Sequence, residues 1–261
     1  LQEEDREAME YTYTYDNASG RRIKNPIWWQ STVTSAGNIT SLIYRAFGKP
    51  FNEEDKSLLG APFAQFVKLN TELRHLWNID KNNAIASRMA VGALFTYGNA
   101  TIAPYSEQFY VGGANSIRAF TVRSVGPGGY HPEEGKYSYL DQTGTFRFEA
   151  NVEYRFRIFK SFWGATFLDA GNVWLLRKDR KLLADGKEAR PNSQLRLKTF
   201  PKQIALGTGV GIRYDMDILV FRLDFGIPLH LPYDTERSGY YNVTGAFFKN
   251  LGIHFAIGYP F

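Results

Sequence analysis

The sequence predicts an all-β protein: the C-terminal portion of a transmembrane, antiparallel, up-and-down β-barrel. Three observations lead to this prediction. Several segments alternate strictly between apolar and polar residues, no apolar run is long enough for a membrane-spanning helix, and the connections between the segments alternate between long and short. A spanning helix needs about 20 consecutive apolar residues, whereas a barrel strand in lipid needs an apolar residue only at every second position.

The clearest alternation runs from Gly144 to Ile158. Successive side chains of a strand point to opposite faces, so one face of this segment is apolar and the other is largely charged. The apolar face comprises Phe146, Phe148, Ala150, Val152, Tyr154, Phe156 and Ile158. A soluble sheet with one face in water could show one such strand. Repetition of the pattern along the chain favours strands in lipid.

The alternation predicts about nine strands, each near the ~9–11 residues of a tilted membrane strand. Their segments are 11–15, 27–35, 67–77, 85–97, 144–158, 162–175, 203–214, 218–227 and 251–261. Short connections alternate with long ones, as periplasmic turns alternate with extracellular loops in bacterial barrels. Nine up-and-down strands cannot close an antiparallel barrel, because the first and last run the same way. We therefore expect missing upstream strands, in a barrel of about sixteen, or one miscounted strand.

Composition narrows the function classes. The net charge of +5 is explained best by solvated loops, with attraction to anionic lipid as the alternative, and the scattered basic residues do not predict nucleic-acid binding. The sequence has no cysteine, which excludes disulfides and thiolate metal sites. His75, His131, His230 and His254 lack metal-ligand spacing, and no catalytic motif is present. We expect no metal, no cofactor and no enzymatic activity.

The longest connection, residues 98–143, is rich in glycine. Its candidate turn residues are Gly112, Gly113, Gly126, Pro127 and Gly128. Glycines at this density indicate tight turns and close backbone approach. A phosphate-binding loop is the enzyme-like alternative, but the required G-x-x-x-x-G-K-[ST] spacing and a following helix are both lacking.

This connection resembles the sixth extracellular loop of the BamA/TamA superfamily of outer-membrane assembly and translocation barrels, which includes surface antigens. That loop carries a Gly-Gly pair followed by Val/Ile-Arg-Gly-Phe/Tyr. The corresponding tip here is Ile117, Arg118, Ala119 and Phe120. Ala119 departs from the family's glycine and resembles the Arg-Ala variant of the TamA-like (TamL) group of Bacteroidetes.

Further motifs resemble the family in the same order, over roughly residues 60–261. They are Glu153–Phe156, Phe167–Trp174, Gly207–Arg213, Phe221–Pro228 and a C-terminal assembly signal with Gly252, Phe255, Gly258, Tyr259 and Phe261. Glycines at 207, 209, 211, 252 and 258 thin the predicted inner face, either to make room for an inserted loop or to leave a path for a permeant.

The resemblance implies that the 98–143 loop folds into the barrel lumen, where Arg118 meets Glu153 and Asp169. A guanidinium offers a rigid fork that satisfies carboxylates, so Arg118 is expected to lock the loop without taking part in catalysis. In the alternative, these carboxylates pair with Arg147, Arg155 or other lumen charges.

The implied function is insertion or export of proteins at the bacterial outer membrane. Residues 1–261 would be part of one barrel domain, with further strands and periplasmic domains upstream. The expected partners are outer-membrane lipid, client outer-membrane proteins and a periplasmic or inner-membrane assembly partner. A passive porin or solute channel is the alternative function, and an enzyme fused upstream is the third.

Overall fold

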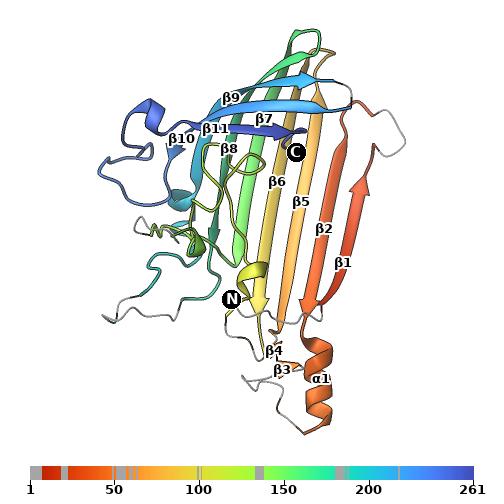
Figure 1. Ribbon diagram of the computed structural model, residues 1–261, viewed down its shortest axis with the longest axis vertical. Helices are drawn as coiled ribbons and strands as arrows, with labels where there is room; N and C mark the ends of the chain where they lie inside the picture. The colour runs from red at the N-terminus through yellow and green to blue at the C-terminus, as the bar shows by residue number, and fades with distance from the viewer. Residues whose placement is uncertain are drawn as a thin grey trace.

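The computed structural model describes residues 8–18, 23–48, 50, 57–58, 61–62, 64–98, 100, 102–132, 138–179, 186, 188–216 and 218–261. Nine antiparallel strands form one curved sheet in the order β1-β2-β5-β6-β7-β8-β9-β10-β11 (Figure 1). They are β1 (Ala8–Asp16), β2 (Ile27–Ala36), β5 (Phe66–Asn78), β6 (Asn83–Thr96), β7 (Phe146–Phe159), β8 (Phe162–Trp174), β9 (Ala205–Asp215), β10 (Val220–His230) and β11 (Gly252–Ile257).

The structure confirms the all-β class, the up-and-down order and the nine strands that the alternation predicts. Short turns join β5 to β6 and β7 to β8 at the upper end of Figure 1, opposite the end at which helix α1 (Asn38–Ala46) lies. This helix and the hairpin of β3 (Ser57–Leu58) and β4 (Ala61–Pro62) lie in the connection between β2 and β5 and were not predicted. Among the described residues, no helix is long and apolar enough to cross a membrane.

The last strand is shorter than predicted. Alternation continues to Phe261, but β11 ends at Ile257 because Gly258 has φ +88°, a left-handed conformation that turns the chain out of the sheet. The Gly258 amide still donates to the carbonyl of Val220, at 2.7 Å, which fixes the position of the turn beside β10.

The outer face of the sheet is an exposed apolar surface. Cross-strand pairs such as Val152 with Leu168 place apolar side chains next to one another on this face. Its exposed members include Leu69, Leu73, Met89, Phe95, Val152, Leu168, Val210, Ile212, Ile253, Phe255 and Ile257. Water would penalise an apolar surface of this extent, whereas lipid tails solvate it.

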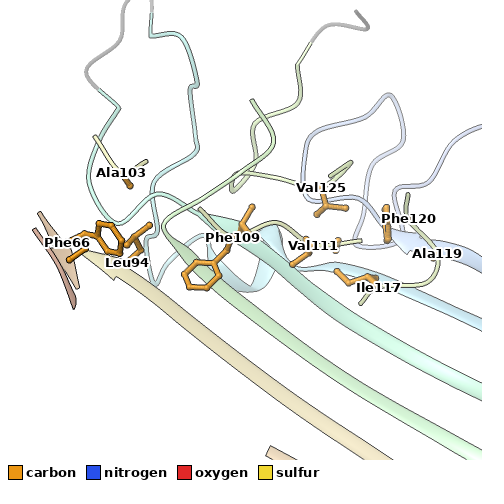
Figure 2. Packing of buried hydrophobic residues seen from close by; sticks show 12 residues of the cluster. Phe66, Leu94, Ala103, Phe109, Val111, Ile117, Ala119, Phe120 and Val125 are labelled. Carbon is orange, nitrogen blue, oxygen red and sulfur yellow. The ribbon is translucent and has the colours of Figure 1, made fainter. Parts of the chain in front are cut away.

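The buried apolar core lies between the opposite, inner face and the connection from β6 to β7, as Figure 2 shows. Phe109, Val111 and Val125 of this connection pack against Leu94 of β6 and Val173 of β8. The Phe109 ring lies against Gly92, where an added β-carbon would come within 2.5 Å of the ring. The inner face therefore holds a folded segment of the same chain.

A charge placed on the outer face tests whether this face contacts lipid. Val152→Arg is expected to destabilise the folded barrel by about 2–4 kcal/mol, the cost of an arginine at the bilayer midplane. Val152→Leu, which adds volume without charge, is the control and should have a much smaller effect. Urea unfolding of the protein in lipid vesicles measures both variants, and equal stability of the two would contradict a lipid-facing position.

Candidate functional site

The candidate site is the tip of the long connection, residues 111–123, together with the strand residues that it contacts. Backbone hydrogen bonds join the two ends of the tip. The Gly113 amide donates to the carbonyl of Phe120 at 2.8 Å, and the Arg123 amide donates to the carbonyl of Val111 at 3.0 Å. Gly112 has φ +100°, and a β-carbon there would lie 2.1 Å from the carbonyl oxygen of Thr121. Glycine is therefore required at this turn for both conformation and space.

A second turn, around Gly126, Pro127 and Gly128, fastens the connection to β8. The Gly128 amide donates to the carbonyl of Val173 at 2.7 Å, and the Asn172 side chain donates to the carbonyl of Gly128 at 2.8 Å. A β-carbon on Gly126 would lie 2.3 Å from the Asn172 Oδ1. These predicted turn glycines thus lie where backbone and strand come into close contact.

The structure brings Arg118 together with both carboxylates named from the sequence. Its Nε and Nη2 donate to the two oxygens of Asp169 at 2.8 and 2.9 Å, and its backbone amide donates to the same side chain at 3.0 Å. Its Nη1 donates to Glu153. The guanidinium also lies over the Phe167 ring, 3.6 Å from the ring centroid. Arg118, Glu153 and Asp169 are each 0% exposed.

Glu153 also pairs with other arginines, one of which is the Arg155 named in the alternative drawn from the sequence. Arg147, the other arginine named there, pairs with Glu149 at 3.3 Å. Glu153 accepts from Arg155 Nε at 2.7 Å and from Arg213 Nη2 at 2.9 Å. Arg213 Nη1 lies 2.6 Å from Oδ1 of Asp224, and the other oxygen of this carboxylate, Oδ2, lies 3.9 Å from Arg118 Nη1. Buried ions of this kind are stable only as a set, because removing one partner leaves an uncompensated charge.

Sequence reasoning missed several members of this site. Arg213 and Asp224 lie within the motifs Gly207–Arg213 and Phe221–Pro228, but the alternation contains no information on which polar residues meet in the lumen. Two further contacts of the tip were also missed: the Ser116 hydroxyl donates to Glu149 at 2.7 Å, and the Asn151 amide donates to the Ser116 carbonyl at 2.8 Å.

Glycines on β9, β10 and β11 form a seat for the tip backbone. A β-carbon on Gly226 would lie 2.6 Å from the Arg118 carbonyl oxygen, and one on Gly252 would lie 3.2 Å from it. A β-carbon on Gly207 would lie 2.3 Å from the Ala119 β-carbon. These three glycines therefore make room for the loop.

Two neighbouring glycines make room for side chains. A β-carbon on Gly209 would lie 2.4 Å from the Phe167 ring. One on Gly211 would lie 2.1 Å from both the Arg213 guanidinium and the Asp224 carboxylate. The glycines of β9 thus leave space for the loop tip and for the ion pair of Arg213 with Asp224.

The residues of the predicted C-terminal signal divide between two environments. Phe255 is 68% exposed on the outer face of β11. Tyr259 and Phe261, beyond the turn at Gly258, contact Arg155, whose guanidinium carbon lies 4.3 and 5.8 Å from their ring centroids. Arg155 also donates to the carbonyl of Phe261 at 3.3 Å. The same arginine therefore contacts Glu153 and the end of the chain.

The ionisable residues of the site pair with each other. In the described ranges, no group of three or more histidine, cysteine, aspartate or glutamate residues is arranged to hold a metal ion. The geometry supports a mechanical role, in which a loop is held against the inner face of a sheet by buried ion pairs and apolar packing.

Comparison with known proteins identifies the family. A family model described as the Omp85 superfamily domain matches residues 48–261. Among solved structures, the crystal structure of BamA from Haemophilus ducreyi lacking POTRA domains 1-3 is similar, with a TM-score of 0.52 and 13% identity. The match covers 96% of this chain and 53% of that one, so the chain spans about half the length of that structure.

At this identity the structural likeness shows the fold, and the family rests on the sequence match, which covers most of the chain. The protein belongs to the Omp85 superfamily.

Proposed function

We propose that this chain is part of a barrel that helps insert or export proteins at the bacterial outer membrane, with Arg118 locking the inserted loop. Family membership supports the general role. The observation that carries the lock is the buried contact of Arg118 with Asp169 and Glu153. Its partners would be outer-membrane lipid, client outer-membrane proteins and a periplasmic or inner-membrane assembly partner.

Charge and geometry support a lock over a catalytic role for Arg118. A guanidinium holds its charge at any physiological pH, which suits a fixed ion pair and does not suit proton transfer. Its fork meets both oxygens of Asp169. Such bidentate contacts constrain orientation as well as distance. The tip sequence Arg118-Ala119 further supports a TamA-like role of the TamL type.

Removing the guanidinium tests the lock. Arg118→Ala should raise local opening of the loop about a hundredfold or more, because breaking a buried ion pair costs about 3–5 kcal/mol. Proteinase K digestion of the loop and the amount of client protein in the outer membrane measure the effect. Arg123→Ala is the matched control, since Arg123 contacts Tyr105 and Tyr110 of its own connection. Unchanged protease resistance and unchanged assembly would refute the lock.

The close contact between Gly207 and Ala119 can be tested by adding a methyl group at one position and removing it at the other. Gly207→Ala should cost about 1–3 kcal/mol of loop docking, because the new methyl overlaps Ala119. Adding Ala119→Gly removes the opposing methyl and should restore most of the loss. Protease resistance of the loop measures both variants. If the double variant were more sensitive than Gly207→Ala alone, the contact would not be the cause.

A passive porin is the second candidate, and one observation bears on it. A cavity of about 380 Å³ remains between the loop and strands β5 to β7, lined by Lys68, Arg88, Arg147 and Glu149 among others. Porins keep a water-filled channel through the lumen, whereas here the loop tip occupies the inner face of β7 to β11.

Conductance separates the two functions. In planar bilayers the full-length protein should show small, unsteady conductance, and deletion of the tip residues 111–123 should give large, steady openings. A wild-type protein with large and steady conductance would favour the porin. Folding of each protein is checked by its heat-dependent mobility in gel electrophoresis.

A further inference from the structure

The loop tip makes a second group of contacts, with side chains of strand β7. The Ser116 hydroxyl donates to Glu149 Oε2 at 2.7 Å and accepts from the Gly112 amide at 2.9 Å. Its carbonyl accepts from Asn151 Nδ2 at 2.8 Å. One residue of the tip is therefore bonded to two strand side chains and to the turn at the base of the tip.

The strand side chains that receive Ser116 are themselves fixed. Glu149 and Asn151 are each 1% exposed, and Arg88 Nη1 donates to both of them at 3.1 Å. Arg88 Nη2 donates in turn to Glu72 of β5 at 3.1 Å. A hydroxyl that meets a carboxylate already oriented by an arginine forms a strong, directional hydrogen bond.

These contacts involve side chains other than the partners of Arg118. Asp169 and Asp224 lie on β8 and β10 and Glu153 lies on β7, whereas Arg88 lies on β6 and Glu149 on β7. The two groups meet at Asn151, which donates to both the Ser116 carbonyl and Asp169. The glycine seat for Arg118 and Ala119 lies on β9 to β11. The tip is thus held at two sides of the inner face.

We propose that Ser116, Glu149 and Arg88 form a second clasp, which keeps the loop in the lumen after the Arg118 ion pairs are broken. The proposal rests on the function proposed above, because it assumes that Arg118 is a lock. Loss of the Arg118 contacts then frees the seat beside β9 to β11 while the tip stays attached to β6 and β7. Full release of the loop requires both clasps to open.

Thiol labelling can test this, because residues 1–261 contain no cysteine. Any cysteine elsewhere in the full-length protein is first replaced by serine. The buried reporter is Val111→Cys, at a position 0% exposed in the core cluster. The exposed comparator is Val122→Cys, in the same loop and 57% exposed. The rate of reaction with a maleimide polyethylene glycol is measured on the full-length protein in outer-membrane vesicles. Heat-dependent gel mobility confirms that each variant is folded.

Each clasp is then removed alone and with the other. Arg118→Ala alone should raise the labelling rate of the Val111→Cys reporter about a hundredfold or more, as for a broken buried ion pair. Ser116→Ala alone should raise it about 10- to 100-fold, the value of a hydrogen bond to a charged group. Each single variant should stay below the Val122→Cys comparator. The double variant should approach the comparator. Ser116→Thr, which keeps the hydroxyl, should preserve protection. Ser124→Ala is the matched control, since that hydroxyl donates to Thr121 within the loop.

The outcomes separate the two proposals. If Arg118→Ala alone labels as fast as the comparator, or if adding Ser116→Ala to it changes nothing, the second clasp is overturned and the Arg118 lock stands. If Arg118→Ala has no effect and Ser116→Ala does, the lock is overturned and Ser116 is the principal attachment.

Discussion

A guanidinium removed from water must be neutralised by carboxylates within hydrogen-bond distance, and this constraint determines how the loop and the sheet fit together. Arg118 is fully buried, as are Glu153, Asp169 and Asp224, which come from three different strands. Each charge would be costly without the others, because a buried ion that loses its partner is strongly destabilising. The position of the loop and the relative placement of β7, β8 and β10 therefore depend on each other.

Glu153 connects this constraint to the end of the chain. It accepts hydrogen bonds from Arg118, Arg155 and Arg213, and Arg155 also contacts Tyr259 and Phe261. One carboxylate thus binds the loop tip and strand β9 directly, and it is linked to the C-terminal residues through Arg155. A change at Arg118 alters the charge available to Arg155, so the loop and the residues after β11 are electrostatically linked.

Period-2 alternation predicted the strands because each has one face in lipid and one towards the lumen. It puts Glu153 opposite the apolar face of its strand, and the resemblance to the family supplied Asp169 and the pairing with Arg118. Alternation specifies a face and not a level along the barrel axis, so the meeting of Arg213 with Asp224 was not predictable. Ser116 had no signal at all. At the C-terminus the alternation continues to Phe261, but Gly258 turns the chain away, so there the pattern overstated the strand.

The tip combines apolar and charged side chains, and the two kinds act differently. Val111, Ile117 and Phe120 are buried in the apolar cluster, which favours any compact placement of the loop because burial has no preferred direction. Arg118 and Ser116 accept only the placement in which oriented carboxylates meet them. Gly207 sets a further limit, since it leaves space for the Ala119 methyl and little more. Apolar burial thus keeps the loop inside, and the polar contacts and the seat select its register.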